Sequence, residues 1–368
     1  MKILIILHKA KKKGGAVLQI LKMAKAFEEK GHVVSTFSFD SVPTTKNIFL
    51  NFGIIVKSLK ARIELFKPDI ILSSEPIITT LFTIIANRKK ITMVVRIGAV
   101  YDSFYAARII ERITPNKIYS PLFNCIRIIL RKFSKFIFRK ISLTVFNSQY
   151  LKDIYHKIAP KSLVIHNGIE NPQIKNLQIN KPVKLVYIGR IEPRKSLELI
   201  IRTLNILKLK NIETSLSIIG KTDLYPSYWK KISNLITKYN LSNEVLIHGE
   251  IENRKLSSIL PNNDILLFST DESNFPITEG LPNVILEGMC NGLVIIATPV
   301  AGIPEIISEE NGFLVSAKPE DFAEKIEYLI KQPEVILSIK KHNVDTIVNR
   351  FLIQDTARKY LIAFKKLL

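Results

Sequence analysis

The sequence is poor in cysteine. Only Cys125 and Cys290 occur among 368 residues, far apart and in apolar segments. Two such cysteines offer neither a disulfide framework nor the paired spacing of a zinc site, and we expect both to be small buried side chains in a reducing compartment. Histidine, aspartate and glutamate form no metal-ligand spacing elsewhere. The sequence therefore predicts no metal centre and no bound cofactor.

Long apolar runs are also lacking. A membrane-spanning helix needs about 18 or more consecutive apolar residues, and no such uncharged run occurs. The first apolar run, residues 3–7, is short, and lysines follow it where a cleavage site would be. We therefore expect a buried strand at the N-terminus, with neither a signal peptide nor a transmembrane helix.

Acidic residues are scarce in the first half of the chain. Residues 1–170 contain 29 lysines and arginines against 10 acidic residues, a net charge of +19, whereas residues 171–368 contain 25 against 22, or +3. A neutral half joined to a strongly basic half indicates that one half meets an anionic surface, with acidic lipid and nucleic acid as candidates. A generally lysine-rich composition explains the total of +22 more easily than it explains this asymmetry.

Strand-like and helix-like segments alternate through both halves. Short apolar runs predict the strands, and apolar residues at helical spacing predict the helices between them. In the first half the predicted strands are 2–7, 32–39, 68–74, 91–97, 143–148 and 163–168, with helices over 14–31 and 77–88. In the second half the predicted strands are 183–189, 214–220, 244–249, 264–269, 293–298 and 312–316, with helices over 195–209, over 225–239, from Pro282, and through the last fifty residues.

This alternation predicts an α/β fold with two Rossmann-like domains, each a parallel sheet with helices on both faces. The expected first domain is 1–170, the linker is the polar stretch 171–182, and the second domain is 183–352. In folds of this kind ligands bind beyond the carboxyl ends of the strands, and with two domains in the cleft between them.

Two strand-end loops carry candidate anion-binding residues. Gly14 and Gly15 open the first helix, where bare N–H groups favour phosphate, although a plain loop explains the pair equally well and the fingerprint G-x-G-x-x-G is absent. GRIEPRKS (189–196) places Arg190, Arg194 and Lys195 just before a helix. Cations there oppose the helix dipole unless an anion such as a diphosphate lies between them. The alternative for this loop is a solvated basic surface.

The third candidate is EGLPNVILEG, residues 279–288. Pro282 suits the first helical position, so the helix is expected to begin there, with the N–H groups of Asn283 and Val284 open to an anion. Glu279 then precedes the helix and Glu287 lies in its second turn. The two carboxylates would be separated along one ligand, where they can accept hydrogen bonds from the hydroxyls of two sugar rings. The alternative is a surface helix with two solvated glutamates.

The segments GRIEPRKS, SIIG, VLIHGEI, DILLFST and EGLPNVILEGMCNGLVIIATPVAGIPEIISEENGFLV resemble the C-terminal half of the family-four retaining glycosyltransferases of the GT-B fold. Glu279 and Glu287 match the E-x7-E motif of that family, and the order of the motifs fits over residues 183–330. GGAVLQILKMAKAFEEKGHVV, VFNSQYLKD and VIHNGIE are similar to its first half. The resemblance covers nearly the whole chain and is most specific in the second half.

The resemblance implies two domains that face each other across a cleft, with an acceptor domain first, a nucleotide-sugar donor domain second, and a final helix, 353–368, packed back on the first. It implies that Arg190 and Lys195 bind the donor diphosphate, that Glu287 holds the ribose, and that Glu279 contacts the transferred sugar. The further donor contacts it implies come from Gly15, Leu281, Pro282, Asn283 and Val284. It also implies that no divalent metal is needed and favours a UDP-sugar as donor.

The chain departs from the family pattern at two places. Ser196 replaces the glycine that usually follows the phosphate-binding lysine. The strand 91–97 leads to no histidine near the transferred sugar, and Arg96, Tyr101 or Asp102 are the candidates to take over acceptor-side contacts. In a retaining mechanism the donor phosphate itself can take the acceptor proton, so the loss of this histidine is compatible with activity. His8 is a further candidate for the cleft, and a structural role for it is equally consistent.

CIRIILRKFSKFIFRKIS (125–142) places basic residues at four-residue steps, and apolar or aromatic residues fill the other faces. The basic residues are Arg127, Arg131, Lys135 and Arg139. This pattern is typical of an interfacial membrane helix, and a core helix with a solvated basic stripe is the alternative. Acidic lipid contributes about 1 kcal/mol for each basic residue near the surface. Together with the charge of the first half, the pattern favours an anionic membrane as partner.

The leading prediction is a metal-independent hexosyltransferase in cell-surface polysaccharide synthesis. It would act on a glycan or lipid-linked acceptor, as a peripheral protein at the cytoplasmic face of the cell membrane. The alternatives are a sugar-nucleotide epimerase of the same fold, which the glutamate pair and the basic loop disfavour, and a soluble transferase with a non-lipid acceptor. No zinc spacing, RNA-recognition signature or helix-turn-helix pattern supports a nucleic-acid-binding protein, and we expect no nucleic-acid partner.

Overall fold

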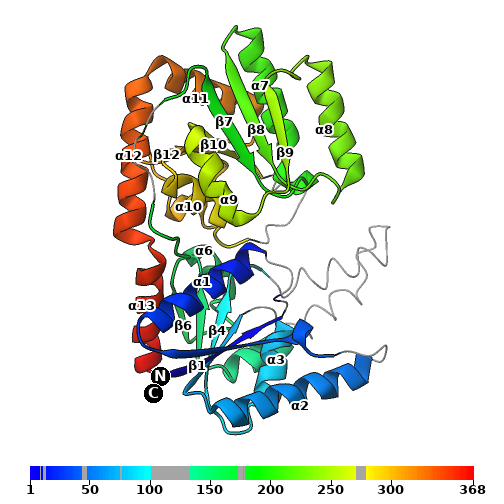
Figure 1. The fold of residues 1–368 in the computed structure, drawn as a ribbon, viewed down its shortest axis with the longest axis vertical. Helices are drawn as coiled ribbons and strands as arrows, with labels where there is room; N and C mark the ends of the chain where they lie inside the picture. The colour runs from blue at the N-terminus through cyan, green and yellow to red at the C-terminus, as the bar shows by residue number, and fades with distance from the viewer. Residues whose placement is uncertain are drawn as a thin grey trace. The chain divides into compact units, whose positions relative to one another are not determined.

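The computed structural model describes residues 1–8, 10, 14–43, 48–74, 77–100, 132–172, 177, 179–270 and 279–368, with no side-chain detail for Ile48, Phe49, Ile77, Ile78, Asn253 and Arg254. The chain forms two compact units (Figure 1). The first comprises the described residues of 1–168, 279–281 and 353–368, and the second those of 169–270 and 282–352.

The first unit is built on a six-stranded parallel sheet in the order β2-β1-β3-β4-β5-β6. Its strands are β1 (Lys2–Leu7), β2 (Val33–Ser38), β3 (Ile70–Ser74), β4 (Thr92–Ile97), β5 (Leu143–Phe146) and β6 (Ser162–Val164). In such a sheet all carboxyl ends lie at one edge, which is where folds of this type place their ligands.

Helices cover both faces of this sheet. They are α1 (Gly15–Glu29), the short η1 (Phe39–Ser41), α2 (Ile48–Phe66), α3 (Ile77–Ala86), α6 (Gln149–Tyr155) and α13 (Ile353–Lys365), together with helical residues 132–139. Ile3 and Ile5 of β1 face α1 and α13, whereas Leu4 and Ile6 face α2 and α3. Burial on both faces explains why these strands read as continuous apolar runs.

The last helix, α13, packs beside α1 on the first sheet (Figure 1). Phe27 of α1 meets Tyr360 and Phe364 of α13 at ring-centroid distances of 6.4 and 5.9 Å. The start of α13 packs directly against Gly168, where a Cβ would lie 2.6 Å from the Cα of Ile353. The C-terminal residues are thus part of the first unit although the second unit precedes them in the chain.

The second unit has its own six-stranded parallel sheet in the order β12-β11-β10-β7-β8-β9. Its strands are β7 (Val183–Ile188), β8 (Thr214–Ile219), β9 (Val245–Gly249), β10 (Ile265–Phe268), β11 (Val294–Ala297) and β12 (Gly312–Leu314). Its helices are η2 (Pro193–Lys195), α7 (Leu197–Leu209), α8 (Pro226–Lys238), α9 (Asn253–Ile259), η3 (Leu260–Asn262), α10 (Asn283–Cys290), η4 (Ile303–Glu305), α11 (Pro319–Lys331) and α12 (Pro333–Arg350).

The predicted α/β class with two Rossmann-like parallel sheets is confirmed, and the strands of the described residues fall in the predicted segments, except that β6 begins one residue earlier, at Ser162. The helix expected from Pro282 begins one residue later, at Asn283. Cys290 is buried, as expected, and Cys125 lies outside the described residues. In the part of the chain that the structure describes, no helix is long and apolar enough to cross a membrane.

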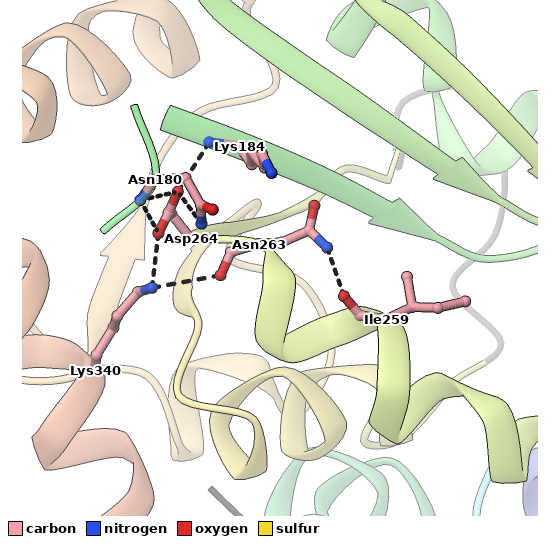
Figure 2. A network of polar contacts seen from close by, with 6 residues as sticks. All are labelled: Asn180, Lys184, Ile259, Asn263, Asp264 and Lys340. Carbon is pink, nitrogen blue, oxygen red and sulfur yellow. Dashed lines mark hydrogen bonds and ion pairs between the residues drawn. The ribbon is translucent and has the colours of Figure 1, made fainter. Parts of the chain in front are cut away.

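A buried carboxylate holds the amino edge of the second sheet together (Figure 2). Asp264, directly before β10, accepts hydrogen bonds from the main chain of Lys184 at 2.9 Å and from the side chain of Asn180 at 3.0 Å. Lys340 of α12 completes the site as an ion pair at 2.7 Å, with both side chains almost fully buried. One side chain thereby joins the approach to β7, the start of β10 and the middle of α12.

We predict that Lys340→Met strongly destabilises the second unit, because it leaves the buried Asp264 charge without its cation. Removing one partner of a buried ion pair costs about 3–5 kcal/mol. The measurement is urea unfolding followed by the fluorescence of Trp229, the single tryptophan, which lies in α8 of this unit.

The double variant Asp264→Asn/Lys340→Met removes both charges and is expected to be more stable than Lys340→Met alone. A loss for Lys340→Met of no more than about 1 kcal/mol, the value of an exposed pair, would contradict this account of the network.

Candidate active site

The carboxyl edge of the second sheet brings several predicted residues together. Loop 189–196 follows β7, Ser269 and Thr270 follow β10, and Thr298 follows β11, all on neighbouring strands. The side chain of Ser269 is buried and donates to the main-chain oxygens of Lys195 and Ser196 at 3.0 and 3.2 Å. The end of β10 therefore fixes the end of the basic loop.

A buried glutamate organises the basic loop. Glu192 Oε1 accepts from Arg194 at 2.9 Å and lies 3.3 Å from Arg190, and only the Arg190 side chain is substantially exposed, at 58% against 6% for Arg194. Glu192 also bonds through its main chain, donating to the Arg190 oxygen at 3.0 Å and accepting from Lys195 N at 2.9 Å. Sequence reasoning grouped three cations here and missed that Arg194 is paired with Glu192.

Lys195 lies below the surface of this loop rather than on it. It is 6% exposed, and its Nζ is 4.5 Å from the centroid of the Phe268 ring. The face of an aromatic ring attracts a cation electrostatically. Screening by water is weak at such a place, so the charge acts strongly on an anion at the sheet edge.

The start of α7 is already capped by the protein. The main-chain N–H of Glu198 donates to the Tyr228 hydroxyl at 3.3 Å, and that of Leu199 to the Ser196 oxygen at 2.9 Å. Burial raises the pKa of Tyr228 to about 12, so this hydroxyl stays neutral. These two N–H groups are therefore already paired, and the expectation of an anion at this helix end stays a prediction, with Arg190 and Lys195 as its candidate side-chain partners.

Helix α10 carries the second group of predicted site residues in the second unit. Its N-cap residue, Pro282, is buried and makes no side-chain capping hydrogen bond. Val284 and Glu287 are half-buried within the helix. The predicted donor contacts Asn283, Val284 and Glu287 thus lie on one short helix, with Pro282 directly before it.

Glu279 lies in the other unit. It forms an isolated antiparallel bridge with Ala99, and the following Gly280 donates to the Gly98 oxygen at 3.0 Å. Residues 279–281, including the buried Leu281, therefore pack with the first unit at the end of β4. The two glutamates of the motif belong to different units, which their spacing alone did not reveal.

The glycine pair of the first unit lies where it was predicted. Gly14 is the extended N-cap of α1 and Gly15 its first residue, and both are exposed. The loop before them is tied to the end of β2, because Ala10 N donates to Asp40 at 3.0 Å and to Ser38 at 3.1 Å. Sequence reasoning missed Ser38 and Asp40, since no local pattern links them to the glycines. His8 packs edge-on against Phe39.

Arg96 is a core residue. It is 2% exposed and donates to Asn167 Oδ1 at 2.6 Å. Burial raises the pKa of the neighbouring Tyr360 in α13 to about 12, a rise that the charge of Arg96 opposes. This placement favours a structural role for Arg96 over the acceptor-side role considered for it. Tyr101 and Asp102, the other acceptor-side candidates, lie outside the described residues.

The basic amphipathic segment is described only from Lys132 onward. Lys135 and Arg139 are exposed on helical residues 132–139, whereas Arg127 and Arg131 lie outside the described residues. Phe133 and Phe136 are 42% and 58% exposed beside these cations. Ile137 and Phe138 are the side chains that enter the core.

Over the described residues, no group of three or more histidine, cysteine, aspartate or glutamate side chains is arranged to hold a metal ion. Among the described residues, the charged groups at the sheet edge of the second unit include the cations Arg190, Arg194 and Lys195 and the carboxylate of Glu192. Such a set is suited to an anionic ligand.

Comparison with solved structures identifies the fold class as GT-B. A glycosyltransferase from Rickettsia africae aligns over 100% of this chain and 98% of its own, with a TM-score of 0.77 and 19% identity. The HepE protein of Anabaena, solved in complex with UDP, aligns over 100% of both chains with a TM-score of 0.74 and 17% identity.

Sequence comparison finds similarity to known glycosyltransferases, mainly in the second unit. Residues 169–344 match the family model described as Glycosyl transferases group 1. An uncharacterised glycosyltransferase of Methanocaldococcus jannaschii is 29% identical over 191 residues, which cover 51% of this chain and 49% of that protein. The chain thus matches about half the length of this curated relative.

We predict that Ser196→Gly stabilises the second unit. Ser196 has φ +42 and ψ +42, a left-handed conformation. That conformation costs a residue with a Cβ about 1–2 kcal/mol, whereas glycine loses about 0.5–1 kcal/mol through its greater freedom in the unfolded chain. The expected net gain is up to about 1 kcal/mol in urea unfolding followed by Trp229 fluorescence. Ser215→Gly, within strand β8, is the matched control and should destabilise. A loss of stability in Ser196→Gly would contradict the prediction.

Proposed function

We propose that the protein is a metal-independent retaining glycosyltransferase of family four, with a UDP-sugar as the favoured donor. The observation that carries the proposal is the basic loop after β7, where Arg190 reaches solvent and Lys195 lies over Phe268, in the same unit as the helix that holds Glu287. The GT-B fold, the family match of residues 169–344 and a structural neighbour solved with UDP support it.

In the proposed reaction, the bond between the anomeric carbon of the sugar and the diphosphate oxygen breaks, and a bond to the acceptor oxygen forms on the same face. The electron pair of the broken bond stays on the diphosphate, and the acceptor proton passes to a diphosphate oxygen. Arg190 and Lys195 stabilise the charge that develops on this leaving group. This is the part that a divalent metal supplies in other transferases.

The remaining groups bind and orient the donor. Glu287 accepts hydrogen bonds from the ribose hydroxyls, and the main chain of residues 281–284 contacts sugar and phosphate. Gly15 contributes its main-chain N–H group at the start of α1, where a helix favours an anion. Glu279 accepts from a hydroxyl of the transferred sugar. These roles follow the E-x7-E pattern and the placement of each residue within its own unit.

The proposal predicts slow hydrolysis of one donor in the absence of acceptor. The protein would be incubated with uridine, guanosine and adenosine diphosphate sugars, and release of the nucleoside diphosphate recorded with and without a chelator. Lys195→Ala and Glu279→Ala should each lower the rate about 100-fold or more, because each removes a group that acts on the reacting centre.

Lys208→Ala is the matched control, since this lysine of α7 forms an ion pair with Glu244 instead. Unchanged hydrolysis in Lys195→Ala, or loss of activity on chelation, would contradict the mechanism. Absence of both turnover and nucleotide binding with every donor would contradict the transferase proposal as a whole.

We further propose that the acceptor is a lipid-linked glycan of cell-surface polysaccharide synthesis, reached at the cytoplasmic face of the membrane. The supporting observation is the face formed by Lys132, Phe133, Lys135, Phe136, Arg139 and Lys140, all exposed. The sequence between Glu111 and Asp153 contains no acidic residue. Cations flanking exposed aromatic rings match the charge and polarity of an anionic bilayer surface.

Binding to liposomes tests this location. Lys135→Glu/Arg139→Glu should weaken binding to vesicles that contain phosphatidylglycerol by at least about tenfold, since each basic residue near the surface contributes about 1 kcal/mol. Lys230→Glu/Lys238→Glu on α8 changes the net charge equally and should have little effect. Equal loss in both variants would contradict the proposed face. Tighter, salt-dependent binding to DNA than to vesicles would favour the nucleic-acid alternative.

A further inference from the structure

Gly280 packs at a position in the first unit that has no room for a side chain, and we call this position the seat of Gly280. A Cβ at this position would lie 2.1 Å from Asn147 Oδ1 and 2.4 Å from Leu151 Cδ1. The main chain on either side is held as well, by the Gly280 hydrogen bond to Gly98 and by the bridge between Glu279 and Ala99. The position of Glu279 is therefore set by its neighbour Gly280.

Both side chains of this seat are firmly placed. Asn147 follows β5 directly, donates its main-chain N–H to the Ile97 oxygen at 3.2 Å and is 2% exposed. Leu151 is fully buried in α6, where its N–H donates to Ser148 Oγ, the helix cap, at 3.3 Å. Because both side chains are buried on a main chain held by β4, β5 and a capped helix, a methyl group on Gly280 must displace either these side chains or the main chain of residues 279–281.

The side-chain oxygen of Asn147 is buried and makes no hydrogen bond within the described residues. It lies instead in the direction where Gly280 carries an α-hydrogen in place of a Cβ. This is the arrangement of a Cα–H···O contact, which recurs where main chains approach closely. An alanine at position 147 would remove this contact without breaking any other hydrogen bond of the Asn147 side-chain oxygen.

We infer that Asn147 is a positioning residue for Glu279, acting through the seat of Gly280. The inference rests on the proposed function, in which Glu279 contacts the transferred sugar. A displaced catalytic group loses rate steeply with distance. Arg190, Lys195 and Glu287 belong to the other unit, so a change at this seat should affect turnover far more than binding of the nucleotide portion.

The test compares turnover with nucleotide affinity in Gly280→Ala and Asn147→Ala. UDP is the binding probe, measured by calorimetry, and hydrolysis of the donor found active with wild type gives kcat. Gly280→Ala should lower kcat about 10- to 100-fold and leave the Kd for UDP within about twofold. Asn147→Ala should keep the wild-type melting temperature and lower kcat about 3- to 10-fold.

Making room for the added methyl group should restore activity. Asn147→Gly/Leu151→Ala, introduced into Gly280→Ala, is expected to raise kcat at least about fivefold, because the displaced main chain can return. Gly53→Ala is the control, since Gly53 is exposed on α2 of the same unit and a Cβ there meets nothing within 4 Å. Its kcat and Kd should equal those of wild type.

Wild-type kcat in both Gly280→Ala and Asn147→Ala would overturn the inference, as would equal weakening of UDP binding and turnover. If Gly280→Ala does not fold, Asn147→Ala decides alone, and unchanged kcat in it overturns the inference. A wild-type protein that neither binds UDP nor hydrolyses any donor would overturn the proposed function, and the inference with it. That failure is visible before any variant is made.

Discussion

The second unit depends on the buried carboxylate of Asp264. It binds the approach to β7, the start of β10 and, through Lys340, the middle of α12, all at the amino edge of the sheet. Buried charges are stable only when paired and fully hydrogen-bonded. With the amino edge fixed in this way, the loops after β7, β10 and β11 rest on rigid strands. The carboxyl edge is left to hold Arg190, Lys195 and α10 in constant relation.

The first unit is held together by helices packed on both faces of its sheet. Its sheet is buried by α1 and α13 on one face and by α2 and α3 on the other. Arg96 of β4 is buried and donates a hydrogen bond to Asn167. The edge of this sheet then receives residues 279–281 from the distant part of the chain. A motif that is continuous in sequence thus supplies one carboxylate to each unit.

The strands were predictable because apolar runs of this length report burial on both faces of a parallel sheet. Loop 189–196 was predictable as a site because it combines a strand end with cations. Three features were not predictable from the sequence: the pairing of Arg194 with Glu192, the capping of α7 by Tyr228 and the seat of Gly280. Each depends on a side-chain conformation or on a partner distant in sequence, and local periodicity contains neither. Phe133 and Phe136 show the same limit, since the helix pattern did not reveal that Ile137 and Phe138 form the buried side.

The central claim is that the carboxyl edge of the second unit binds a nucleoside diphosphate through Arg190 and Lys195. The most direct measurement is calorimetric titration of the wild-type protein with UDP, UMP and uridine at one ionic strength. The account predicts that affinity rises strongly with each phosphate, because charge-assisted bonds to two cations are gained. It also predicts that the advantage of UDP over UMP disappears in Arg190→Ala. Equal affinity for uridine and UDP, or no binding of either, would contradict it.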